Sequence, residues 1–214
     1  MVDRATSAFL IPAWLLAIGM AAGATEVKVP TPPSRGISRT HVLFEDDFSH
    51  DLRHWKSDRT GVWTIHDRML RAHLPDKKQQ HAFIYAGDPT WADYALDFDV
   101  CAMRGVDKGA AVRVEKESGI GVDLRGPGYQ DILLHRREWQ MGKAPARNLN
   151  GEWHHVRVEA HGHRYRVLVD GALKLDRVDE HRSYPRGRIA LAAYTGGVGR
   201  CTVYYANVVV TELE

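Results

Sequence analysis

Apolar and polar residues alternate along most of the chain from Val42 onward, and this period of two is the strongest constraint on its fold. Successive side chains of a strand point to opposite faces of a sheet, so the alternation predicts strands with one buried face. Turn-forming residues separate these stretches at intervals of about ten residues, which is typical of an antiparallel sandwich or barrel. No stretch has an apolar stripe at helical spacing, so we expect an all-β fold. The clearest strands are at 110–116, 119–125, 153–160, 164–170, 188–194 and 202–210.

The length of 214 residues suits one domain with a sizeable core, which we place at residues 42–214. Lys and Arg total 29 against 27 Asp and Glu, so the whole chain carries no electrostatic footprint for a nucleic acid. Residues 25–41 include VPTPPSRG, whose closely spaced prolines disfavour helix and sheet interior. We interpret this segment as a Pro-rich linker.

Residues 1–24 run from a short polar start through an apolar stretch to small residues, the pattern of a secretory signal peptide. The apolar run is shorter than the roughly 20 residues of a spanning helix, and Pro12 interrupts it. Asp3 departs from the pattern, because it offsets the basic residue beside it. We predict cleavage after Ala24 and a secreted or periplasmic protein that has no membrane contact after cleavage.

The chain has two cysteines, Cys101 and Cys201. An exported chain passes through an oxidising compartment, so we predict a disulfide between them. If their strands run antiparallel with Cys101 opposite Cys201, Phe98 faces Tyr204, and apolar side chains share one face of the sheet. Two unpaired core thiols are the alternative.

Four histidines, His154, His155, His161 and His163, lie within residues 151–171. Alternation sends the first two to opposite faces of a strand, and the other two flank the glycine of a hairpin turn. We interpret all four as parts of a β-hairpin, with His161 and His163 solvated at its turn. A zinc ion held by His161, His163 and a third ligand is the alternative.

Several stretches together resemble the concanavalin A-like lectin/glucanase superfamily, the jelly-roll sandwich shared by laminin G-like domains and legume lectins. Within it, the likeness is strongest to the 3-keto-disaccharide hydrolase family, formerly a domain of unknown function. The resemblance implies an antiparallel two-sheet jelly roll that acts on or binds carbohydrate. The matching stretches are LFEDDFSHDLRHW, GVWTIHDRMLRA, WADYALDFDV, GAAVRV, GEWHHVRVEAHGHRYRVLVDG, GRIALAAY and VYYANVVVTEL, which cover most of residues 43–213.

Two departures from the resemblance are clear. Arg68 follows Asp67 where such domains have a glycine in their first hairpin, so that turn must be built differently. The Glu-x-Asp-x-x-Glu arrangement of the superfamily's retaining glucanases is absent from the sequence. An ordinary laminarinase-type activity is therefore not expected.

Polar residues that alternate with apolar ones on the central strands are the candidates for glycan binding. The alternative for each is that it has no binding role and belongs to a solvated sheet face with cross-strand ion pairs. The candidates are Arg113, Glu115, Asp123, Arg125, His135, Arg137, Arg157 and Glu159.

Arg113 and Asp123 stand out, because neighbouring strands place a guanidinium and a carboxylate on one face. Sugar hydroxyls are bound by such planar hydrogen-bonding groups, together with an aromatic platform. Trp139 is our candidate platform, since it lies in a polar stretch after a strand. A Trp that covers the edge of the sandwich is the alternative.

Hydrolysis of a glycosidic bond uses two carboxyl groups about 5 to 9.5 Å apart. Glu115 with Asp123, or with Glu117, can reach that range across neighbouring strands. The alternative is that EKESG, which holds both glutamates, is a charged hairpin tip. We expect no required cofactor.

A structural calcium ion often lies near the start of domains in this superfamily. The resemblance suggests Asp47, or its neighbour Asp46, as a ligand, since calcium prefers hard oxygen donors. Distant ligands near Asn207 would have to complete the site.

Three functions follow from these observations. One is a secreted carbohydrate-active enzyme of the 3-keto-disaccharide hydrolase type. Another is a non-catalytic, lectin-like glycan-binding module. The third is a laminin G-like domain that binds a protein. The fold alone does not separate them, because one sandwich hosts all three.

Overall fold

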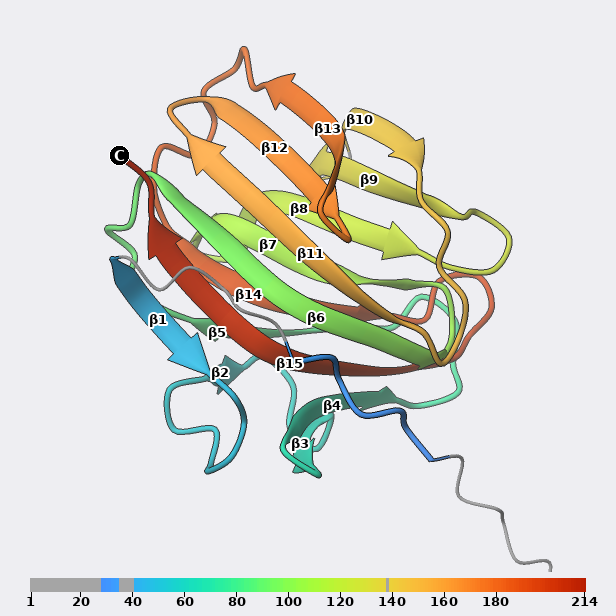
Figure 1. Cartoon of the computed structure of the whole chain (residues 1–214). Coiled ribbons are helices and arrows are strands. Elements are labelled where there is room, and N and C mark those ends of the chain that lie inside the picture. Colours follow the sequence, from blue (N-terminus) through green and yellow to red (C-terminus); the bar gives the residue numbers. More distant parts are fainter. Residues whose placement is uncertain (1–27, 35–40, 138) are drawn as a thin grey trace, which may run out of the picture.

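The computed structural model describes residues 28–34, 41–137 and 139–214, and shows two antiparallel sheets packed face to face (Figure 1). The predicted all-β sandwich is confirmed. The predicted signal peptide lies outside the described residues. No helix that could cross a membrane occurs in the described part of the chain.

Sheet A has the strand order β13-β12-β11-β6-β15-β4-β3, with β1 also paired to β15, and sheet B has the order β10-β9-β8-β7-β14-β5-β2. The strands of sheet A are β13 (Ala172–Val178), β12 (Arg164–Val169), β11 (Trp153–His161), β6 (Tyr94–Arg104), β15 (Cys201–Glu212), β4 (Met69–Leu74), β3 (Trp63–His66) and β1 (Val42–Asp46). Those of sheet B are β10 (Trp139–Pro145), β9 (Asp131–Arg136), β8 (Ser118–Arg125), β7 (Asp107–Glu115), β14 (Arg188–Tyr194), β5 (His81–Ala86) and β2 (Lys56–Ser57).

The core lies between the sheets and is built from the apolar half of each alternation. Phe98 and Val158 of sheet A and Ile120 and Leu191 of sheet B are all buried there. Burying each such side chain contributes about 1.5–3 kcal/mol to folding. The other half of each alternation therefore faces outward and is available for function.

Tyr205 links the two sheets. Its side chain is fully buried, and its hydroxyl oxygen accepts a hydrogen bond from the Gly109 amide at 3.1 Å. The same hydroxyl lies within hydrogen-bonding distance of the carbonyl oxygens of Gly109 and Ala192. A side chain from β15 of sheet A thus reaches between β7 and β14 of sheet B.

The β3–β4 and β11–β12 hairpins have left-handed backbone conformations at their turns. Asp67 and Arg68, between β3 and β4, have φ values of 49° and 59°, so a turn of the I′ type forms without glycine. Gly162 has φ 54° between β11 and β12, as its position predicts.

His154 and His155 lie on opposite faces of β11, as predicted. The ring of His154 is paired with Asp170 at 2.8 Å, whereas that of His155 lies between Asp97 and Asp99. No group of three or more His, Cys, Asp or Glu that could hold a metal ion occurs among the described residues.

The described part of the Pro-rich segment, residues 28–34, lies against the outer face of sheet A. Val29 packs on a small apolar cluster there that includes Met69 and Tyr204. The Trp153 indole N–H donates to the Pro30 carbonyl at 2.7 Å. An extended Pro-rich backbone has no internal hydrogen bonds, so its carbonyls are available to such donors.

The predicted disulfide is not formed. Cys101 and Cys201 are both buried and free, and Cys101 is paired with Tyr204 while Cys201 is paired with Leu74. Cys201 belongs to the core between the sheets, whereas Cys101 points outward with Met103. Tyr204 takes the place opposite Cys101 that was predicted for Cys201, and this offset of three residues, an odd number, places the two thiols on opposite faces of sheet A.

Candidate functional site

An open groove of about 470 Å³ lies on the outer face of sheet B. Cross-strand pairing arranges the outward residues of sheet B in rows that run toward β5, and in two of the rows the middle positions hold only glycine and alanine. The rows are His135, Gly121, Ala111, Ala190 and Tyr85; then Asp123, Gly109, Ala192 and Phe83; then Arg125, Asp107, Tyr194 and His81. The small residues form the floor, and the larger side chains rise on either side.

Aromatic rings form one wall of the groove along β5. Phe83 and Tyr85 stack with their centroids 6.2 Å apart and their planes at 28°, and His81 lies 5.8 Å from Phe83. Alternation places these three rings on one face of the strand. Stacked rings of this kind bind the apolar face of a ring-shaped ligand.

Asp107 lies in the third row and is the carboxyl group with the most perturbed acidity in the groove. Burial raises the pKa of Asp107 to about 6, and the neighbouring charge of Asp123 adds to the effect. Its Oδ1 is buried without a hydrogen-bond partner among the described residues. A carboxyl group that titrates near neutral pH can take up and release a proton during catalysis.

His135 and Asp123 form an ion pair in the opposite wall. His135 Nε2 lies 3.0 Å from Asp123 Oδ2, and its Nδ1 lies 2.6 Å from the Arg137 carbonyl oxygen. A carbonyl accepts only, so Nδ1 carries a proton. Burial lowers the pKa of His135, but the hydrogen bond and charge of Asp123 outweigh burial and raise it above its ordinary value. The Asp123 carboxylate therefore favours the protonated imidazole, which can donate a proton.

Asp123 and His135 are thus predicted site residues that the structure brings together. Glu115 is exposed at the β7–β8 hairpin, whereas Glu117 and Ser118 of that hairpin line the groove. The second carboxyl group near Asp123 in this groove is Asp107, which was not predicted from the sequence.

Arg113 does not face solvent, contrary to the expectation. It is fully buried, it has φ 52°, and it lies where the β7 register shifts at a bulge. Its guanidinium donates to Asp93 at 2.8 Å and to the carbonyl oxygens of Ala92, Gly162 and Tyr184. The bulge turns this side chain away from the Asp123 face, so its role is structural.

Arg125 and Arg157 are engaged elsewhere. Arg125 makes a bidentate pair with Asp131 at 2.7 and 2.8 Å, and the Tyr129 ring lies against it at 4.3 Å. Arg157 belongs to sheet A, on the opposite side of the sandwich from the groove, and its guanidinium pairs with Asp97. Neither residue lines the groove.

Trp139 lies at the edge of the sandwich. Its side chain is 73% exposed, and it borders a smaller hollow with Arg136 and Tyr184 rather than the groove. The aromatic platform of the groove is supplied by Phe83 and Tyr85 instead.

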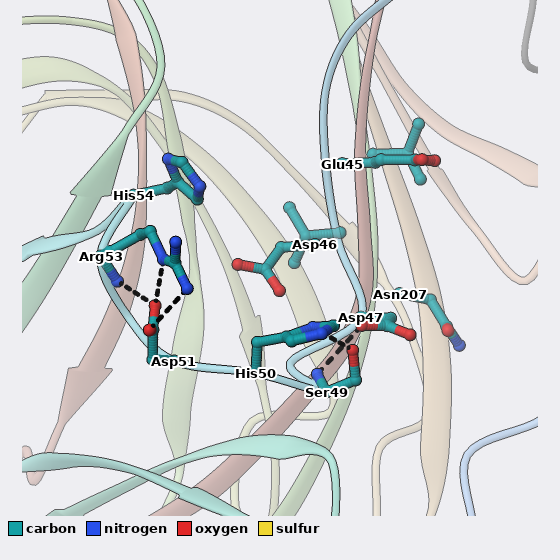
Figure 2. A pocket seen from close by; sticks show the side chains of 11 residues that line it. Glu45, Asp46, Asp47, Ser49, His50, Asp51, Arg53, His54 and Asn207 are labelled. Carbon is teal, nitrogen blue, oxygen red and sulfur yellow. Dashed lines mark hydrogen bonds and ion pairs between the residues drawn. The ribbon is translucent and has the colours of Figure 1, made fainter.

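The region around Asp47 does not fit the expected calcium site (Figure 2). Asp47 accepts hydrogen bonds from Ser49 and Arg68, which lower its pKa to about 2. Asp46 accepts from the Phe48 amide and the Trp55 indole at 2.7 and 2.8 Å. N–H donors occupy the oxygens that a calcium ion would need. Asn207 lines the same pocket, but its amide donates to Asp99.

Sequence reasoning missed Asp107 and the aromatic wall. Asp107 stands at the start of its strand, where acidic residues are common in turns. A usable signal was nevertheless present, because the outward positions 109, 111, 121, 190 and 192 hold glycine or alanine where a solvated strand carries polar side chains. Small residues on neighbouring strands leave room for a ligand.

The fold is shared with solved structures of low sequence identity. Carbohydrate-binding module CBM66 from Bacillus subtilis has a TM-score of 0.60 at 16% identity, over 74% of this chain and 96% of that one. A protein of unknown function with a galectin-like fold, also from Bacillus subtilis, has a TM-score of 0.60 at 11% identity, over 81% and 96%. These similarities confirm the jelly-roll sandwich.

A putative glycosyl hydrolase from Parabacteroides distasonis has a TM-score of 0.58 at 16% identity, over 78% of this chain and 98% of that one. No curated protein matches the chain. The model of the 3-keto-alpha-glucoside-1,2-lyase-like domain matches residues 40–211, which include both sheets except for Glu212, the last residue of β15. The chain therefore belongs to the 3-keto-alpha-glucoside-1,2-lyase-like domain family.

Proposed function

We propose that the groove on sheet B binds a 3-keto-glucoside and releases its aglycone by elimination between C1 and C2. The observation that carries this proposal is the placement of Asp107, Asp123 and His135 around a floor of glycine and alanine, opposite two stacked rings. The family description names a lyase of this type, and the groove has the proton-transfer groups that such a reaction needs.

The keto group allows a carboxylate to act as the base of this elimination. A carbonyl at C3 acidifies the proton on C2, and the substituent on C1 is then positioned to leave. Asp107 removes the C2 proton, the electron pair forms the C1–C2 double bond, and the C1–O bond breaks. The leaving oxygen takes a proton from the His135 imidazolium, so atoms and charges balance. Addition of water to the unsaturated product would complete a net hydrolysis.

Position within the groove supports this assignment of base and acid. Asp107 lies in the third row, and its buried Oδ1 has no hydrogen-bond partner among the described residues, as a base that waits for a substrate proton requires. His135 lies two rows away, next to Arg137 and toward the β7–β8 hairpin. The sugar would therefore lie between them, with C1 directed toward the hairpin.

The test is incubation of the purified protein with methyl 3-keto-α-glucoside in deuterated water, followed by NMR. We expect release of methanol and an unsaturated keto sugar, and no reaction of the unoxidised methyl glucoside. Asp107→Asn should lower the rate at least about a hundredfold, whereas Asp88→Asn, an exposed turn carboxyl, should leave it unchanged. Binding without turnover would instead support a lectin-like module.

We also propose that the protein acts outside the cytoplasm. The polar, apolar and small-residue order of residues 1–24 supports export. Mass spectrometry of the protein from a secreting host checks this, since cleavage would leave an amino terminus at Thr25.

A further inference from the structure

The two ends of the groove differ in chemistry. Asp107 lies toward one end of the groove. From its row, the Asp123 row and then the His135 row lead to the β7–β8 hairpin at the other end. Toward that hairpin the floor and wall are Ala111, Val114, Ala190 and Tyr85. The polar side chains at that end are Glu117, Ser118 and Arg137, with the His135 imidazole in the opposite wall and the Arg188 guanidinium against Tyr85. The space next to the leaving group is therefore mostly apolar.

Tyr85 is held as a fixed flat surface in this space. Its ring stacks on Phe83 at 6.2 Å, and the Arg188 guanidinium carbon lies 5.6 Å from its centroid. The backbone at Tyr85 is paired on both sides, with Ala190 of β14 and Lys56 of β2. A ring fixed in this way loses little freedom when a second ring stacks on it.

A sugar leaving group and an aromatic leaving group make different demands on this surface. A sugar carries several hydroxyls that need hydrogen-bonding partners, and an unpaired hydroxyl in an apolar site is costly. A phenolic group needs apolar area and a ring to stack on, which Tyr85, Val114 and the two alanines supply. Arg137 at the rim can lie against the edge or face of the same ring.

We infer that the leaving group is a flat aromatic aglycone that stacks on Tyr85, so the substrates are 3-keto-glucosides of phenols. This inference rests on the proposed function, since it assigns the other half of the same substrate. Tyr85 is then a specificity-determining residue. It lies beside the leaving group and takes no part in proton transfer.

The test compares phenyl and methyl 3-keto-glucosides with the wild type, Tyr85→Ala and Tyr85→Phe. Phenol leaves more readily than methanol, so the readout is the ratio of wild-type to variant kcat/KM for each substrate. We expect Tyr85→Ala to lower kcat/KM about tenfold more for the phenyl glycoside than for the methyl glycoside, mainly through KM. Tyr85→Phe keeps the ring and should restore the wild-type value.

Tyr129→Ala is the matched control, because Tyr129 is 57% exposed and lies outside the groove. Equal losses for the two glycosides in Tyr85→Ala would overturn the aromatic assignment and leave the proposed function standing. No turnover of either glycoside by the wild type would overturn the proposed function itself, and the inference with it.

Discussion

The His135 ring lies directly over Gly121, where a β-carbon would come within 2.3 Å of both Cε1 and Nε2 of the imidazole. The two residues are cross-strand partners on β9 and β8, so the missing side chain of one makes room for the ring of the other. The glycine therefore sets the position of the Asp123 and His135 ion pair.

Gly121→Ala should displace His135 and separate it from Asp123. We expect the pKa of His135, followed by NMR of its ring protons, to fall toward its ordinary value, and activity to drop about a hundredfold. Gly197→Ala is the control, since a β-carbon there meets nothing within 4 Å. An unchanged His135 titration in Gly121→Ala would contradict this account of the glycine.

Asp107→Asn should stabilise the protein while it abolishes activity. The folded pKa of about 6 exceeds the ordinary aspartate pKa of 3.8, so ionisation of Asp107 destabilises the fold as pH rises through this window. We expect a gain of about 1–2 kcal/mol at pH 8 and almost none at pH 4, measured by urea unfolding at both values. A gain of equal size at both values would assign the effect to packing instead of charge.

His155 should make stability fall in alkaline solution. Burial lowers its pKa, but hydrogen bonds from His155 to Asp97 and Asp99 outweigh burial and raise it to about 9. The stabilisation is therefore complete below the unfolded pKa of about 6.5 and is lost as pH rises through about 9. Thermal melts of wild type and His155→Gln should differ most at pH 6 and converge near pH 10.

Arg113→Met should be strongly destabilising, by about 3–5 kcal/mol in urea unfolding, because it leaves Asp93 and several buried acceptors without their donor. Arg53→Met removes an exposed pair with Asp51 and should change the free energy of unfolding far less. Similar losses in the two variants would show that burial of Arg113 matters little.

Both thiols should react only after unfolding. Burial raises the pKa of Cys101 and of Cys201 to about 11, so neither forms a reactive thiolate at neutral pH. A thiol-reactive dye should label no cysteine in the native protein and two in denaturant, and a reductant should leave Tm unchanged. If no cysteine is labelled in denaturant until a reductant is added, the two cysteines form a disulfide, and this account of two free thiols is wrong.

The strands were predictable because burial of one sheet face requires an apolar residue at every second position of each strand. The segments at 153–160 and 164–170, for example, correspond to β11 and β12 around the predicted Gly162 turn. The outward orientation of the Asp123 and His135 side chains was predictable for the same reason, since each residue alternates with core residues on its strand.

The errors arose where a bulge broke that alternation. Arg113 and Asn207 both have positive φ, and both lie where the pairing register shifts. One bulge turned Arg113 inward, and the stretch of β15 between two bulges is offset by three residues from the predicted pairing with Cys101. Neither residue is a glycine, so the sequence carries no local mark of these bulges.

The Tyr205 hydroxyl anchors the middle of the groove floor from behind, since Gly109 and Ala192 are its partners and sheet A supplies the ring. The shape of the groove floor on sheet B thus depends in part on a side chain of sheet A. Directed evolution of this protein should consequently recover beneficial changes on β15, far from any residue that a ligand touches.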